Sequence, residues 1–217
     1  MKKQLVLLFF YFILLGFLSA EEPVIWHEDF SDNEAKWAVA DNDTVMIKIE
    51  NGNFVFQHKR TEGGYYAWNY SYLDDSEPFS IEITIKHLAG TDDYGYGLTW
   101  GMLDLDNYYS FDITSSGYYR IAKTDNGNWQ AYVDWKASGY INTYGGSNKL
   151  GVKKVDEQLK FYINNSYVDQ IAFEYFFDDG VGFAVWRNQT IVVDDLIIRG
   201  TEYYDDFEDY FYDWFDE

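Results

Sequence analysis

Hydrophobic and polar positions alternate along most of the chain with a period of two residues. The segment Val45–Glu50 alternates in this way, and after Asn51-Gly52 the apolar positions resume at Phe54. This period places successive side chains on opposite faces of a strand. Asn-Gly is the strongest signal for a two-residue hairpin loop, and such a loop pairs Ile49 with Phe54. The pattern therefore predicts a hairpin with one apolar face.

The stretch from Tyr108 to Trp135 predicts three further strands joined by short loops. The strands are Tyr108–Thr114, Tyr118–Thr124 and Asn128–Trp135, and the loops are Ser115-Ser116-Gly117 and Asp125-Asn126-Gly127. Both loops have three residues with Gly in third place, which fits a type I turn closed by a left-handed glycine. The expected structure is an antiparallel meander.

The loop lengths predict a register for this meander. Phe111 is expected opposite Ile121 on an apolar face, and Asp112 opposite Arg120 on a polar face. The same register continues to the third strand, where Ala131 follows Ile121 on the apolar face and Tyr132 follows Arg120 on the polar one. A slip of one residue would exchange the two faces. In this phase the tryptophans belong to the apolar side, and we expect them in the core: Trp100, Trp129 and Trp135.

The rest of residues 24–200 continues in the same pattern without a long helical period. The other expected strands are Tyr66–Tyr72, Phe79–His87, Tyr94–Leu103, Leu159–Asn164, Tyr167–Phe173, Val181–Arg187 and Thr190–Arg199. About 12 short strands with polar turns are typical of an all-β fold, here a two-sheet antiparallel jelly-roll sandwich. Because no linker is visible, we expect one domain over residues 21–201.

The N-terminal 20 residues are a separate segment. Lys2 and Lys3 precede an almost wholly apolar run, Leu5–Leu18, and Ser19-Ala20 offers a small-residue cleavage site. The run is shorter than the roughly 20 residues that span a bilayer. Residues 1–20 are therefore predicted to be a secretory signal peptide. The protein is then expected to be secreted, extracellular or periplasmic, without membrane insertion after cleavage.

Composition and charge limit the kinds of partner that the protein can bind. The chain has 37 acidic residues against 16 basic ones, and two of the basic ones are Lys2 and Lys3. Such a negative field repels nucleic acid and anionic membranes, so no nucleic-acid partner is expected. There is no cysteine, and 21% of the residues are aromatic. Stability must therefore come from a large aromatic core rather than from disulfides.

The last 16 residues, 202–217, break the strand pattern. They consist of eight acidic and eight aromatic residues and nothing else. One interpretation is a frayed acidic tail. Another is an adhesive segment that engages a cationic partner, and a third is a flap that folds onto the domain.

Three runs of residues carry a resemblance to a known family: Tyr96–Gly101, Asp106–Phe111 and Gly117–Ile121. In their order they resemble the middle of a concanavalin A-like lectin/glucanase domain. More narrowly, they are similar to the laminin G-like and three-keto-disaccharide-hydrolase-type jelly rolls of secreted bacterial proteins. The resemblance covers about residues 24–200. It implies two curved antiparallel sheets and a carbohydrate ligand, sometimes with a calcium ion, and some members are glycosidases.

A mixed aromatic and polar face is the candidate binding site. Sugar rings present C–H faces to aromatic side chains, while polar groups take the hydroxyls in a shallow site. The residues expected to share that face are Tyr108, Asp112, Tyr118, Arg120, Gln130, Tyr132 and Asp134. They predict a glycan or cell-surface ligand. The alternative is an ordinary solvated sheet face with a cross-strand Asp112–Arg120 pair.

Catalysis has less support in the sequence. Glycoside hydrolysis needs two carboxylates about 5 to 9 Å apart. The glucanase branch carries a Glu-x-Asp-x-x-Glu strand motif, and this chain lacks it. No catalytic residue is therefore predicted. The expected function is a non-catalytic carbohydrate- or surface-binding module, with a glycosidase-like hydrolase or a structural adhesion domain as alternatives.

Calcium is the one ion for which the sequence offers ligands. Asp104 and Asp106 alternate on one side of a strand or loop, and calcium takes oxygen ligands. They are the candidates for a metal site, and the alternative is an ordinary acidic loop, which is common in a chain this acidic.

Overall fold

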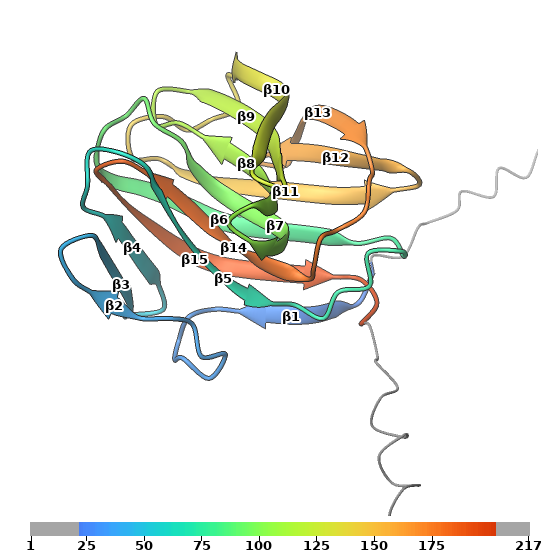
Figure 1. Cartoon of the computed structure of the whole chain (residues 1–217), viewed down its shortest axis with the longest axis horizontal. Coiled ribbons are helices and arrows are strands. Elements are labelled where there is room, and N and C mark those ends of the chain that lie inside the picture. Colours follow the sequence, from blue (N-terminus) through green and yellow to red (C-terminus); the bar gives the residue numbers. More distant parts are fainter. Residues whose placement is uncertain (1–21, 203–217) are drawn as a thin grey trace, which may run out of the picture.

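The computed structural model describes residues 22–202, and these fold into fifteen strands arranged as two antiparallel sheets (Figure 1). Residues 22–202 contain no helix of the length and apolarity that crossing a bilayer requires. The predicted all-β sandwich is confirmed. The predicted signal peptide and almost all of the acidic tail lie outside the described residues.

The larger sheet has nine strands. Their order is β13 (Ser166–Ala172), β12 (Gln158–Ile163), β11 (Ser147–Val155), β6 (Ser80–Gly90), β15 (Gln189–Arg199), β4 (Phe54–His58), β3 (Val45–Ile49) and β2 (Ala40–Asp41), with β1 (Val24–Glu28) beside β15. The strand β15 is shared, because its first half pairs with β4 and its second half with β1.

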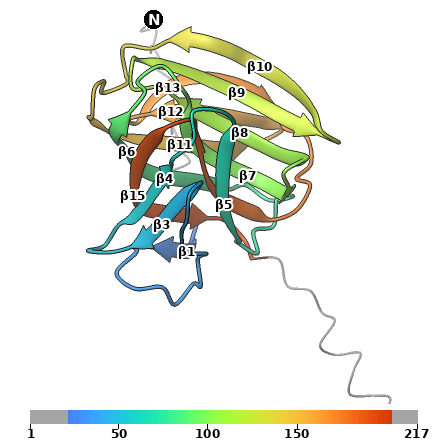
Figure 2. The same cartoon turned by 60° about the vertical axis from the view of Figure 1, so that its left-hand side comes forward.

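The smaller sheet has six strands, with β10 at one edge and β5 at the other (Figure 2). Their order is β10 (Asn128–Ala137), β9 (Tyr118–Asp125), β8 (Asn107–Ile113), β7 (Tyr96–Asp104), β14 (Gly180–Trp186) and β5 (Gly64–Tyr70). This sheet carries the candidate site on the face that points away from the core.

The core between the sheets is strongly aromatic. Trp37 stacks on Phe183 with ring centroids 5.2 Å apart, and Phe111 meets Phe161 edge-on at 5.2 Å. Trp100 is fully buried among them, as predicted. Aromatic pairs of this kind add to the free energy gained from area burial. They supply the packing on which a chain without cysteines depends.

Two predicted hairpins have the predicted register. Asn51 and Gly52 both have positive φ, 54° and 72°, and the loop pairs Ile49 with Phe54. Between β8 and β9, Gly117 has a φ of 100° and closes a three-residue loop. That loop places Phe111 opposite Ile121 and Asp112 opposite Arg120, both as predicted.

The loop between β9 and β10 differs from the prediction. Asp125 pairs with Asn128, so only Asn126 and Gly127 form the loop, with φ values of 49° and 75°. Two left-handed residues make a type I′ turn, whose twist matches that of the strands. The prediction of a three-residue loop is therefore wrong, and Ala131 lies opposite Ala122 instead of Ile121.

Because this loop is one residue shorter than predicted, the side chains of β10 exchange the two faces of the sheet relative to the prediction. Trp129 pairs with Thr124, and two irregularities follow, one on each side of Val133. As a result Trp129 and Trp135 lie on the side of Arg120, where they are 50% and 37% exposed. The prediction that these two tryptophans belong to the core is wrong.

Candidate functional site

The outer face of the six-stranded sheet carries polar residues that are nevertheless buried. Thr99 and Asp112 have no exposed surface, and Ser110 has almost none. They alternate with core residues such as Trp100 and Phe111, so they point away from the sandwich interior. Buried polar groups on an outer face indicate that larger side chains lie over them.

Arg120 is the centre of that covering layer. Its Nη2 donates to Oδ2 of Asp112 over 2.8 Å, and the hydroxyl of Ser110 donates to the same oxygen over 3.3 Å. The guanidinium carbon lies 4.5 Å from the ring centroid of Trp135 and 5.2 Å from that of Trp129. A guanidinium over a tryptophan face is attracted by the ring quadrupole. Arg120 is therefore fixed by a carboxylate below it and by two indole rings.

A glycine makes room for one of these rings. A Cβ on Gly95 would lie 3.0 Å from Cη2 of Trp135 and 3.3 Å from Cβ of Asp112. The segment before β7 thus passes close under the indole, and any larger residue there would push Trp135 outward.

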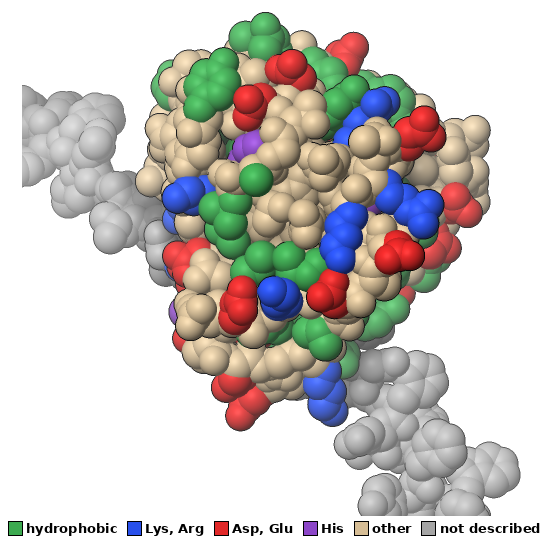
Figure 3. All heavy atoms as spheres, turned by 90° about the vertical axis from the view of Figure 1, so that its left-hand side faces the viewer, with side chains coloured by type: hydrophobic (Ala, Val, Ile, Leu, Met, Phe, Trp, Pro, Cys, Tyr) green, Lys and Arg blue, Asp and Glu red, His purple; other side chains and the backbone are tan. Residues whose placement is uncertain are grey.

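These side chains line a pocket of about 430 Å³ at one end of the sheet, which we call the Arg120 pocket. Its lining residues are Asp93, Tyr94, Gly95, Arg120, Trp129, Trp135, Trp186 and Arg187. They come from β9, β10, the β6–β7 connection, the end of β14 and the β14–β15 turn. Figure 3 views the molecule from the side of that turn, where Lys and Arg side chains adjoin hydrophobic ones.

The far wall of the Arg120 pocket is backed by aromatic rings that pack edge to face. Trp186 meets Tyr66 edge-on at 5.9 Å, and the hydroxyls of Tyr66 and Tyr108 are 2.8 Å apart. Burial raises the pKa of Tyr66 far above its usual value, which keeps this phenol neutral. The guanidinium carbon of Arg187 lies 4.2 Å from the ring centroid of Tyr94.

A second hollow, on the outer face of the nine-stranded sheet, has its charges largely paired. It measures about 320 Å³. Glu82 in its wall is 2.9 Å from Nζ of Lys149 and 3.2 Å from Nη1 of Arg199. Two of its cations are thus engaged by one carboxylate, and its lining contains one aromatic residue, Tyr162, against four around the Arg120 pocket. The Arg120 pocket is the better candidate site.

Three of the predicted site residues come together in the structure. Tyr108, Asp112 and Arg120 share the outer face of the six-stranded sheet, although Tyr108 and Asp112 lie beneath its surface. Tyr118 belongs to the same face at its margin, 45% exposed, and lies opposite Ala137.

The three predicted residues of β10 do not join them. Tyr132 packs against the core, and its hydroxyl donates to Oε1 of Glu174 over 2.7 Å. Gln130 lies opposite Lys123, and Asp134 is exposed, with Oδ1 accepting from the backbone N–H of Trp135. The prediction that Tyr132 faces the same side as Arg120 is wrong. The cause is the one-residue difference in the β9–β10 loop.

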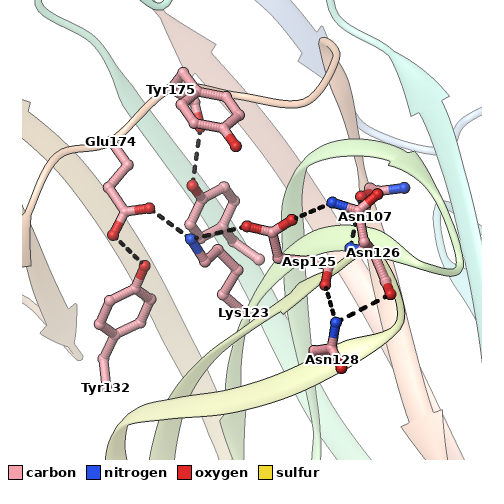
Figure 4. Close-up of polar contacts among 9 residues, drawn as sticks. Asn107, Lys123, Asp125, Asn126, Asn128, Tyr132, Glu174 and Tyr175 are labelled. Atoms are coloured by element: carbon pink, nitrogen blue, oxygen red, sulfur yellow. Dashed lines mark hydrogen bonds and ion pairs between the residues drawn. The ribbon is translucent and has the colours of Figure 1, made fainter.

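Tyr132 belongs instead to a polar network at the sheet margin (Figure 4). Nζ of Lys123 is 2.6 Å from Oε2 of Glu174 and 3.4 Å from Oδ2 of Asp125. The hydrogen bonds from Lys123 and Tyr132 lower the pKa of Glu174. This network fastens the segment after β13 to β9 and β10, and it lies away from the pocket.

The calcium candidates form a turn rather than a cluster. Oδ1 of Asp104 accepts from the backbone N–H of Asp106 over 2.8 Å and from Nδ2 of Asn107 over 2.9 Å. Within residues 22–202 no group of three or more His, Cys, Asp or Glu side chains is placed to hold a metal ion. In this arrangement Asp104 closes the turn between β7 and β8, and calcium binding at Asp104 and Asp106 stays a prediction.

Of the eight residues that line the pocket, only Arg120 was predicted as a site residue. The seven that were missed from the sequence are Asp93, Tyr94, Gly95, Trp129, Trp135, Trp186 and Arg187. The signal for the two β10 tryptophans was present, since Asn126-Gly127 is itself a two-residue hairpin signal. For Trp186 and Arg187 no local pattern points to a site, because the β14–β15 turn is brought to Tyr94 only by the sheet order β8-β7-β14.

Comparisons with known proteins identify the fold. No family model matches the chain, and no curated protein does. The solved carbohydrate-binding module CBM66 from Bacillus subtilis is similar at 19% identity and a TM-score of 0.56, over 76% of this chain and 95% of that one. The GH43 protein BlXynB from Bacillus licheniformis is similar at 10% identity and a TM-score of 0.58, over 81% of this chain and 39% of that one.

A third similar structure comes from the human gut microbiota and is described with endo-acting O-glycanases that initiate mucin breakdown. It has 9% identity and a TM-score of 0.59, over 83% of this chain and the whole of that one. At such identities the likeness is one of fold, a jelly-roll-like β-sandwich.

Proposed function

We propose that this protein is a non-catalytic carbohydrate-binding module that holds its ligand in the Arg120 pocket. The observation that carries the proposal is the position of Arg120, fixed by Asp112 and flanked by Trp129 and Trp135. The folds to which the chain is similar include a carbohydrate-binding module, which supports the same function.

The chemistry of the Arg120 pocket suits a sugar. The exposed indoles offer flat apolar surfaces to the C–H faces of a sugar ring, and arginine N–H groups donate to hydroxyl oxygens. The volume of about 430 Å³ lies within the range of small-molecule sites. Because Arg120 is pre-positioned, less side-chain entropy is lost when a ligand binds.

The carboxylates favour binding over hydrolysis. Asp93 is the only acidic residue in the lining of the Arg120 pocket, and Asp112 is fully buried below it with Oδ2 occupied by Arg120. Hydrolysis of a glycosidic bond by the common mechanisms requires two carboxylates on either side of that bond. The described residues offer only one there.

The proposal extends to family and location. The order of the sequence motifs supports membership of the concanavalin A-like group, and the apolar N-terminal run supports secretion with removal of residues 1–20. A cell-surface glycan is then the expected partner. The acidic tail, residues 202–217, is the segment that would bind a cationic partner.

A glycan-array screen with residues 21–217 tests the proposal. For any glycan that binds, we expect Trp135→Ala and Trp129→Ala each to weaken affinity roughly thirty-fold, about 2 kcal/mol, as for an aromatic hot spot. The matched control is Tyr167→Ala, since Tyr167 on β13 is 50% exposed, as Trp129 is, but lies on the other sheet. Unchanged affinity in both tryptophan variants would contradict the proposed site, and an array without any bound glycan would contradict the function.

A further inference from the structure

Arg187 is a cation without a carboxylate partner in the described structure. Arg120 pairs with Asp112 and Arg199 with Glu82, whereas no carboxylate oxygen in residues 22–202 lies within 4.0 Å of the Arg187 guanidinium. Arginine is charged at every physiological pH. The Arg120 pocket therefore contains one guanidinium whose charge is not neutralised by direct contact.

The position of Arg187 is fixed from several sides. Its backbone N–H donates to the carbonyl of Gly63 over 2.9 Å, and its carbonyl is 3.0 Å from Nδ1 of His58. The face of its guanidinium lies over the Tyr94 ring. When one face stacks on an aromatic ring, the N–H edge is left to donate hydrogen bonds in the plane of the group. Arg187 thus presents a planar set of N–H donors, and its backbone and its guanidinium are both held in place.

This arrangement contrasts with the rest of the molecule. The chain has 37 acidic residues against 16 basic ones, yet two of the four arginines in residues 22–202 line one pocket. Asp93 is the only acidic residue among the lining side chains. A ligand there meets a donor fork, one carboxylate acceptor and three indoles.

We propose that the Arg120 pocket recognises a sugar that carries a carboxylate, and that Arg187 binds this carboxylate. The inference rests on the proposed function and specifies its ligand class. The planar fork of an arginine matches a carboxylate with two parallel hydrogen bonds. Asp93 accepts from hydroxyls of the same sugar, and the indoles contact its ring.

The net charge limits the ligand further. A strongly negative protein repels polyanions over several ångströms. A glycan with one acidic sugar at its end gains the contact with Arg187 and carries a single negative charge, so it is repelled much less than a polyanion. A long polyuronate has a negative charge on every sugar residue, so we expect the protein to repel it.

A matched pair of ligands tests the inference. One is an oligosaccharide ending in a single uronic acid, and the other is the same oligosaccharide with its carboxyl group reduced to a hydroxymethyl group. With residues 21–217, calorimetric titration should show the acid binding at least tenfold more tightly than the reduced sugar. Arg187→Gln should remove that difference, and Arg187→Lys should retain part of it. The control Lys160→Gln removes a cation from β12 on the other sheet and should change neither affinity.

The outcomes separate the two proposals. If both sugars bind wild type equally and Arg187→Gln has no effect, the carboxylate inference is wrong while carbohydrate binding stands. If neither sugar binds and the glycan array is also negative, the proposed function fails with it. Arg187 lies at a turn with a φ of 59°, which glutamine tolerates about as well as arginine. The substitution also removes the stacking on Tyr94, so the thermal midpoint of Arg187→Gln should fall by only a few degrees, which confirms folding.

Discussion

Arg120 donates from Nη2 to Oδ2 of Asp112 over 2.8 Å, at a place where Asp112 has no exposed surface and the Arg120 side chain only 14%. Removing the cation alone would leave a buried carboxylate without an opposite charge, with only the hydroxyl of Ser110 to donate to it. We therefore expect Arg120→Met to lower the free energy of unfolding by about 3–5 kcal/mol. Urea denaturation of the variant measures this.

The matching double variant gives the control. Asp112→Asn combined with Arg120→Met removes both charges, so its loss should be smaller than that of Arg120→Met alone. A double variant whose loss equals the sum of the two single losses would show that the pair is not coupled.

Tyr132→Phe separates the polar network at the sheet margin from the pocket. The hydroxyl of Tyr132 donates to the carboxylate of Glu174, and a hydrogen bond to a charged group contributes about 1.5–3 kcal/mol when well buried. Because Glu174 is partly exposed, we expect a loss near the lower limit of that range, measured by urea denaturation. Glycan affinity should stay at the wild-type value, and a large drop would place Tyr132 in the site after all.

Gly95→Ala should distort the pocket without breaking the fold. The new methyl group would lie 3.0 Å from Trp135, so the indole must shift by a few tenths of an ångström. We expect a change in tryptophan fluorescence and a several-fold loss of glycan affinity. Unchanged fluorescence and affinity would show that Trp135 is not packed on this glycine.

Two buried histidines should make stability depend on pH. Burial lowers the pKa of His87 and of His58 below 6.5, and for His87 the nearby Asp92 opposes that shift in part. The unfolded chain then takes up these protons more readily than the folded one. Stability should therefore be full above about pH 6.5 and fall as the pH is lowered through the depressed values.

Urea midpoints at pH 7.5 and 5.5 measure this dependence. His87→Gln should flatten it relative to wild type, since glutamine does not titrate. A variant with the same fall in midpoint as wild type would assign the pH dependence to other groups.

The fold could be predicted from the sequence further than the site. Alternation and turn residues were sufficient for the sandwich and for the Asp112–Arg120 pair, because a three-residue loop closed by Gly117 leaves one register. At Asp125-Asn126-Gly127 the same three-residue interpretation failed. Both Asn126 and Gly127 tolerate left-handed φ, so the tighter type I′ turn forms, and Asp125 remains in its strand.

Other features of the structure could not be predicted from the sequence pattern because they depend on tertiary contacts. The strand β11 was not predicted, since two of its inward positions are Asn148 and Lys154. Both side chains can be buried because they donate hydrogen bonds to backbone carbonyls outside the strands. Nδ2 of Asn148 donates to the carbonyl of Asn142, and Nζ of Lys154 donates to that of Asp75. Arg187 belongs to the same class, because its neighbours in the pocket come from distant parts of the chain.

The two ends of the described domain meet at one corner of the molecule. The N–H of Gly200 donates to the carbonyl of Pro23 over 3.0 Å, beside β1 (Figure 1). From the turn at Arg187, the eleven residues of β15 run about 35 Å to that corner. A tether attached through either terminus would thus leave the opposite pole free, and the domain would present its pocket outward from whatever support carries it.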